Sequence, residues 1–136
     1  MTLLAVLIAA VASYAFGAVW YMVMAKPWMA AAGLSEETIN RSNPVPYILA
    51  FICAVLVAGM MRHIFFLSGI DTVGKGIVGG LGLGLFIATP WIVTNYGFSN
   101  RPRNLALIDG AYATGGCTIM GLVLGLMAGG GAEVAG

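Results

Sequence analysis

TNYGFSNRPRNLALIDGAY, residues 94–112, joins two long apolar segments through a short basic turn. The same stretch carries an amide and a carboxylate in a chain that is otherwise mostly hydrocarbon. Cationic and polar groups gather where membrane helices leave the hydrocarbon core. We therefore interpret the stretch as a tight hairpin between two membrane helices, with these polar groups at one membrane face: Asn95, Arg101, Arg103 and Asp109.

The composition of the whole chain agrees with this interpretation. Of its 136 residues, 60% are hydrophobic and 8% are charged, and the mean hydropathy is +0.97. Soluble domains contain about 25% charged residues, so this chain lacks the charge to cover a water-facing surface. A net charge of +1 gives no electrostatic footprint for nucleic acid. The first expected partner is therefore the lipid bilayer.

Four apolar segments predict four membrane-spanning helices. The first covers 22 positions, which reach about 33 Å as a helix and can cross a hydrocarbon core of about 30 Å. A cleaved signal peptide is the alternative, but no Lys or Arg precedes this segment and it exceeds an apolar region of about 7–15 residues. The predicted fold is all-α, a four-transmembrane-helix bundle in one domain over residues 1–136. The expected helices are 3–24, 46–67, 76–98 and 105–127.

A short interfacial helix is expected between the first two spans, within residues 27–40 and ended by Gly33. A solvated loop anchored by Trp28 is the alternative. Aromatic side chains are typical of the membrane–water boundary. Four of them are predicted interfacial anchors: Trp20, Tyr21, Trp28 and Tyr96.

Small residues recur at four-residue spacing and predict close helix contacts. The glycine-rich run 74–84 is not a nucleotide-binding loop, because no Ser or Thr follows its Gly-Lys pair and no strand pattern precedes it. Later in this helix, Pro90 predicts a kink whose freed backbone groups Thr89 or Thr94 could satisfy. The predicted packing positions are Gly17, Gly76, Gly80, Gly84, Gly121 and Gly125.

The distribution of cations predicts the orientation. With four spans both termini share a side, which also holds Arg62 and Lys75, whereas the opposite side holds four cations. Cytoplasmic loops carry the excess of Lys and Arg. Loops 26–43 and 99–104 are therefore expected in the cytoplasm and both termini in the periplasm.

Asp109 lies about one turn into the fourth helix, where a carboxylate facing lipid would cost a few kcal/mol. We expect it to face Asn95 on the neighbouring helix, with Arg101 or Arg103 folded back onto it. Lys26 is a further candidate partner, and Tyr112 lies one turn along the same helix. The cluster is interpreted either as a structural clasp or as the lining of a small cavity that binds a cation, a proton or a basic solute.

No catalytic, metal or cofactor site is expected. A lone carboxylate without a second acid or an activated nucleophile matches no common catalytic plan. The single histidine, His63, and the two cysteines, Cys53 and Cys117, do not form a zinc-binding pattern. We therefore predict that the protein is not an enzyme.

Three stretches resemble a known family: GAVWYMVMAKPWMAAAGLSEE at 17–37, the hairpin at 94–112 and the closing glycine-rich helix. They are similar to the bacterial domain-of-unknown-function family 1761, small four-helix integral membrane proteins. The resemblance implies a four-span bundle in the bacterial inner membrane and supplies no activity. The long glycine-rich third helix is a departure that we interpret as a contact for a specific partner. The family pattern maps onto Gly17, Trp20, Tyr21, Trp28, Gly33, Thr94, Asn95, Tyr96, Arg101, Asp109 and Tyr112.

Two functions follow from these patterns. The first is a non-enzymatic helix-packing module that acts as a homo-oligomer or as an accessory subunit of a larger membrane complex. The alternative is a subunit of a small ion or solute transporter or channel that uses Asp109 and Asn95.

Overall fold

The computed structural model describes residues 2–130, and these residues form helices and no strand. This confirms the predicted all-α class. Four helical rods are long and apolar enough to cross a membrane: Leu3–Val23, Val45–Ser68, Val73–Phe98 and Arg103–Ala128. The elements are α1 (Thr2–Val23), α2 (Ala25–Ala32), α3 (Val45–Ser68), α4 (Val73–Leu83), η1 (Gly84–Ala88), α5 (Thr89–Phe98) and α6 (Arg103–Gly130).

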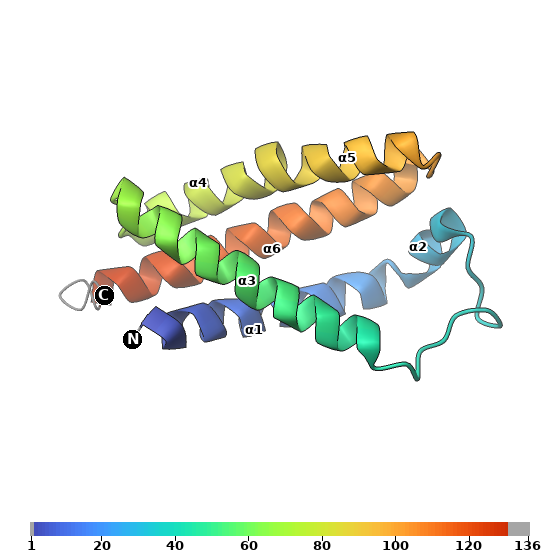
Figure 1. Ribbon diagram of the computed structural model, residues 1–136, viewed down its shortest axis with the longest axis horizontal. Coiled ribbons are helices and arrows are strands. Elements are labelled where there is room, and N and C mark those ends of the chain that lie inside the picture. The colour runs from blue at the N-terminus through green and yellow to red at the C-terminus, as the bar shows by residue number, and fades with distance from the viewer. Residues whose placement is uncertain (1, 131–136) are drawn as a thin grey trace.

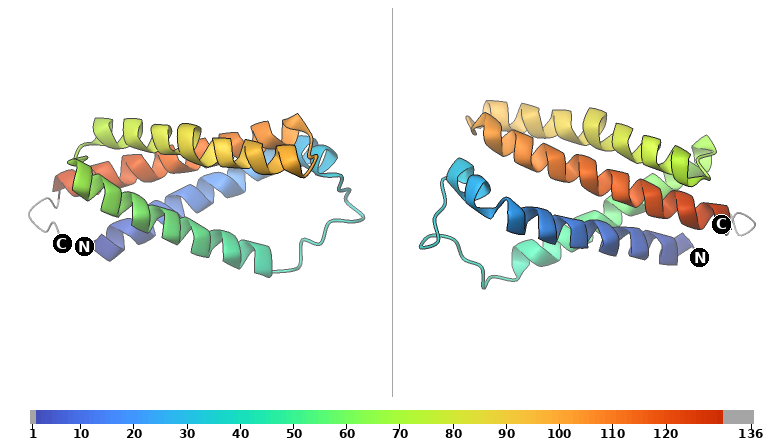
Figure 2. Two further views of the ribbon diagram at one scale, coloured as in Figure 1. Left: turned by 45° about the horizontal axis from the view of Figure 1, so that its top comes forward. Right: turned by 180° about the vertical axis from the view of Figure 1, so that it is seen from behind.

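The rods run along the long axis of the molecule, and α6 lies at the centre of the contacts (Figure 1). The start of α1 and the end of α6 lie at the same end of the molecule, as an even number of spans requires (Figure 1). At the opposite end, α2 approaches the turn between α5 and α6 (Figures 1 and 2). The short α2 is the predicted helix between the first two spans, and Gly33 ends it with a left-handed φ of 74°.

The closest helix pair is α4 and α6, whose backbones meet at glycines. A methyl group on Gly76 would clash with the carbonyl oxygen of Gly121, and one on Gly80 would clash with that of Cys117. A methyl group on Gly84, the first residue of η1, would likewise clash with the Cα atom of Thr114 on α6. Small residues permit such approach, and helix association in lipid depends on this packing because lipid tails are as apolar as the side chains.

A π-helical segment, η1, interrupts the third rod just before Pro90. The Thr89 hydroxyl donates to the Gly84 carbonyl at 2.8 Å and lies 3.2 Å from the Gly110 carbonyl of α6. Of the two threonines considered from the sequence, Thr89 therefore makes the backbone contact. It also links η1 to α6.

The core of the described residues lies between α1, α3 and the second half of α6. Small side chains, Ala9 of α1 and Ala58 of α3, are completely buried there, beside Phe65 and Leu124. The first turns of α3 lie away from this core: all six residues from Val45 to Ala50 are exposed. The α3 rod therefore packs against the core from Phe51 onward and diverges from it over residues 45–50.

Two helix starts differ by more than one residue from the expected positions. The third rod begins at Val73 rather than Gly76, because the Thr72 hydroxyl accepts the backbone N–H of Lys75 at 3.2 Å and caps the helix. The fourth begins at Arg103 rather than Leu105, directly after Pro102, whose carbonyl accepts the N–H of Leu105 at 3.1 Å.

Candidate functional site

Asp109 on α6 is bound by tyrosines from two other helices. The hydroxyl of Tyr21, near the end of α1, donates to Oδ1 at 2.5 Å. The hydroxyl of Tyr96, near the end of α5, donates to Oδ2 at 2.5 Å. Each oxygen of the carboxylate thus accepts one phenol, and the two bonds join α1, α5 and α6 at the same level.

Trp20 extends this connection by one residue. Its indole N–H donates to the backbone carbonyl of Ile108 at 3.1 Å, next to Asp109 in the chain. Trp20 and Tyr21 therefore bind consecutive residues of α6 through one backbone and one side-chain acceptor. Since helix contacts in lipid gain little from apolar burial, such directional bonds help to fix the end of α1 against α6.

Aromatic rings surround the Tyr21 side of the carboxylate. Tyr112, one turn along α6, makes an edge contact with Tyr21 at a centroid distance of 5.2 Å and lies parallel to Phe16 at 6.4 Å. Trp28 of α2 packs edge-on against Tyr21 at 6.1 Å. These rings keep the Tyr21 hydroxyl directed at Asp109, since aromatic pairs prefer such offset and edge geometries.

Gly17 makes room for this arrangement on α1. A Cβ atom at this position would lie 2.5 Å from Cε1 of Tyr112, a distance that real Cβ atoms do not show. The absence of a side chain therefore allows the Cε1 edge of the Tyr112 ring to approach the backbone of α1. We call the set Trp20, Tyr21, Tyr96, Asp109 and Tyr112 the tyrosine clasp.

The other residues expected around Asp109 lie elsewhere. The described ion pairs within residues 2–130 are Arg41–Glu36 and Lys75–Asp71, and neither includes Asp109. Arg101 donates to the Ala32 carbonyl at the end of α2, at 3.5 Å. Arg103 and Lys26 are exposed, as is Asn95, whose backbone carbonyl accepts from Ser99. The structure brings Asp109 and Tyr112 together, but not with the amide or the cations.

Within the tyrosine clasp, the partly buried carboxylate of Asp109 is bound by phenol hydroxyls, and neither described ion pair includes it. An ionisable group inside a membrane protein faces the protein interior and needs hydrogen-bond donors there, because lipid provides none. Here two neutral phenols supply the donors, and both belong to helices that must be held together. Among the described residues no group of three or more His, Cys, Asp or Glu could hold a metal ion.

Sequence reasoning identified Tyr21 and Tyr96 as interfacial anchors and as positions of the family pattern, and did not pair them with Asp109. The available signal was depth: each of the three residues lies within two turns of the same end of its span. Depth in the membrane alone favours Asn95 as a partner of Asp109 as much as it favours Tyr96. Consecutive helical residues point about 100° apart, so only one of the two can face α6.

Comparison with known proteins identifies one matching family. A family model described as "Protein of unknown function (DUF1761)" matches residues 4–125, which confirms the resemblance of the sequence motifs. No match was found among curated proteins or among solved structures. The family description assigns no activity, so the geometry of the chain has to carry any proposal of function.

Proposed function

The chain belongs to the family of proteins of unknown function DUF1761, and we propose that it is a non-enzymatic helix-packing module of the membrane. In this proposal the protein associates with further membrane helices, either of its own copies or of a larger complex. It resides in the bacterial inner membrane, with both termini in the periplasm and the clasp near the cytoplasmic face.

The observation that carries the proposal is the exposed start of α3. All residues from Val45 to Ala50 are exposed, and six positions cover more than one full turn of about 3.6 residues. Within the described chain, the hydrogen bond that links these turns to another helix runs from the Tyr14 hydroxyl of α1 to the Tyr47 carbonyl at 3.1 Å, and more than half of the surface of Tyr47, Ile48 and Leu49 remains open. Their apolar sequence is suited to a neighbour from another chain.

The small residues of α3 support the same conclusion. Ala54 and Ala58 lie four residues apart and are buried in the core, whereas Ala50, one step earlier in the same row, is exposed. The row thus continues beyond the part of α3 that the core covers. On α4, a Cβ atom at Gly74 or Gly82 would meet nothing within 4 Å beyond the local helix backbone, which leaves two smooth positions open to a neighbour.

The clasp supports a packing role more than transport. The transporter alternative required Asp109 and Asn95 to line one pathway. Both oxygens of Asp109 accept phenol hydroxyls that connect helices, and Asn95 is an exposed residue of α5. No observation on the described residues favours a shared pathway.

The test measures the mass of the full chain in lipid nanodiscs and in mild detergent. We expect a species larger than the 14.1 kDa monomer, or a copurifying membrane subunit in stoichiometric amount. Leu49→Trp on α3 should lower the fraction of that species. Leu126→Trp on α6 is the matched control, since the two leucines are 55% and 61% exposed. A wild-type chain that is monomeric and without a partner in both media would refute the proposal.

A further inference from the structure

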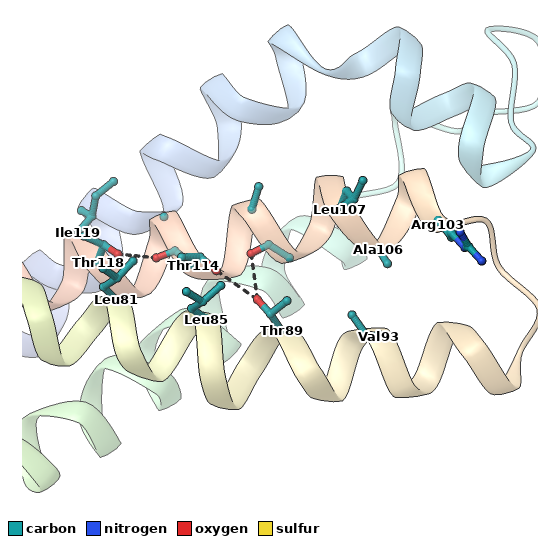
Figure 3. A pocket seen from close by; sticks show the side chains of 13 residues that line it. Leu81, Leu85, Thr89, Val93, Arg103, Ala106, Leu107, Thr114, Thr118 and Ile119 are labelled. Atoms are coloured by element: carbon teal, nitrogen blue, oxygen red, sulfur yellow. Dashed lines mark hydrogen bonds between the residues drawn. The ribbon is translucent and has the colours of Figure 1, made fainter.

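A groove of about 970 Å³ runs along the outer face of the α5–α6 hairpin, separate from the tyrosine clasp. Apolar and small side chains line most of it, and Arg103 is the one charged residue among the lining residues (Figure 3). Figure 3 shows Arg103 at the end next to the α5–α6 turn, with Ile119 and Leu81 at the other end. We propose that this groove binds one phospholipid with an anionic headgroup, its phosphate at Arg103 and an acyl chain along α6.

The length of the groove matches one leaflet. Arg103 and Ile119 are separated by sixteen residue steps along α6, about 24 Å at 1.5 Å per residue. One leaflet, taken as half of a bilayer with its headgroups, is about 20–22 Å thick. The groove therefore reaches from the headgroup layer to about the bilayer midplane. A transmembrane helix from a partner would need a contact surface along the whole span, whereas this groove covers α6 only from Arg103 to Ile119.

The glycine contacts limit the depth of the groove along its half near Ile119. There the third rod and α6 meet at Gly84 with Thr114 and at Gly80 with Cys117, so the groove lies over the seam between the helices and does not pass between them. Toward the turn the rods separate. Val93 of α5 and Leu107 of α6 form exposed walls there.

The polar groups inside the groove are engaged with the protein. Thr118 donates to the Thr114 carbonyl at 2.7 Å, and the hydroxyls of Thr114 and Thr89 lie 3.1 Å apart. Thr89 also contacts the Gly84 carbonyl at 2.8 Å. Because these hydroxyls have internal partners, the groove offers mainly hydrocarbon to its occupant, as an acyl chain requires and a polar solute does not.

Arg103 supplies the headgroup contact. A guanidinium presents several donors to phosphate oxygens and keeps its charge at all relevant pH values. It is exposed at the helix start, directly after Pro102, and the α5–α6 turn holds it at the mouth of the groove. A cation at the mouth of an apolar groove complements an anionic phospholipid, in which a phosphate is followed by a hydrocarbon chain.

The test is native mass spectrometry of the full, delipidated chain with equal amounts of phosphatidylglycerol or phosphatidylcholine carrying the same acyl chains. Wild type should retain phosphatidylglycerol about fivefold better, the preference that one cation gives at an anionic lipid surface. Arg103→Gln should abolish the preference, and Arg103→Lys should keep most of it. Lys26→Gln, which removes an exposed cation outside the groove, should keep it entirely.

A second variant tests the acyl chain. Ala111→Phe fills the groove and should lower retention of both lipids, whereas Ala15→Phe at an exposed position of α1 should lower neither. Equal retention of the two lipids by wild type, or an unchanged preference in Arg103→Gln, would overturn the proposal. A disulfide-linked dimer formed through Leu107→Cys in membranes would also overturn it, because a helix would then occupy the groove.

Discussion

The Tyr21 hydroxyl lies 2.5 Å from Oδ1 of Asp109, although the two residues are 88 positions apart in the chain. This bond connects the end of the first span to the beginning of the last. Tyr96 binds the other carboxylate oxygen from the third span. One side chain thus determines how three of the four spans meet at this end of the molecule.

Removal of either phenol hydroxyl should weaken the fold. Tyr21→Phe and Tyr96→Phe each delete one hydrogen bond and retain the ring, with an expected cost of about 0.6–2 kcal/mol in the free energy of unfolding. The double variant should cost more than the sum of the two, because a carboxylate that has lost both donors is left without a partner. Reversible unfolding in mixed micelles measures these differences.

The control for this prediction is Tyr47→Phe. Tyr47 is an exposed tyrosine of α3 that accepts the Tyr14 hydroxyl through its backbone carbonyl, so the loss of its own hydroxyl leaves that bond intact. The clasp would have no role in stability if Tyr21→Phe and Tyr96→Phe unfolded with the same free energy as this control.

Two glycines of α4 that are separated by one residue should respond in opposite directions to alanine. Gly80→Ala forces a methyl group into the Cys117 carbonyl of α6 and should destabilise the fold by about 1–3 kcal/mol. A Cβ atom at Gly82 would meet nothing within 4 Å beyond the local helix backbone, so Gly82→Ala should be neutral, or stabilising by up to about 1 kcal/mol through helix propensity. Thermal unfolding of the two variants provides the comparison. Equal effects would show that α4 and α6 do not meet at Gly80.

Gly17 and Tyr112 should be energetically coupled. Gly17→Ala places a methyl group 2.5 Å from Cε1 of Tyr112, so the ring must move away from its contact with Tyr21. The expected cost is about 1–3 kcal/mol. In a Tyr112→Leu background the same change should cost less, with a coupling energy of about 0.5–3 kcal/mol. Gly97→Ala, which meets nothing within 4 Å, is the control, and additive effects of Gly17→Ala and Tyr112→Leu would contradict the contact.

Hydropathy was sufficient to predict the four spans, because a helix that crosses lipid must be long and apolar wherever its neighbours lie. Hydropathy also indicated which residues lie at the same depth in the membrane, and it therefore predicted that Asp109 and Asn95 lie near the same membrane face. It could not indicate the direction in which each side chain points. Asn95 and Tyr96 differ by one position and about 100° around α5, and the structure directs Tyr96 to Asp109.

Contacts between distant segments were the least accessible from the sequence. Arg101 or Arg103 was expected to fold back onto Asp109, on the same hairpin. Arg101 reaches the Ala32 carbonyl instead, 69 positions away, at the end of α2. The ends of helices carry unpaired carbonyls and partial negative charge, which attract a cation. That partner becomes visible only when the position of α2 beside the α5–α6 turn is known.

The Thr89 hydroxyl should stabilise the π-helical segment and the α5–α6 contact together. It reaches the Gly84 carbonyl at 2.8 Å within the rod and the Gly110 carbonyl at 3.2 Å on α6. Thr89→Val keeps the side-chain volume and removes the hydroxyl, so we expect a loss of about 0.6–2 kcal/mol in the free energy of unfolding. Amide hydrogen exchange should become faster at residues 84–89, since this segment loses a bond that secures it.

Thr94→Val is the matched control for Thr89→Val, because Thr94 is an exposed threonine of the same helix. Its effect on stability should stay within about 0.5 kcal/mol, as for other surface substitutions. Thr89→Ser should restore most of the loss, since it returns the hydroxyl without the methyl group that lies against Gly110. If Thr89→Val and Thr94→Val exchanged amide hydrogen at the same rate over residues 84–89, Pro90 and the backbone alone would account for the π-helical segment.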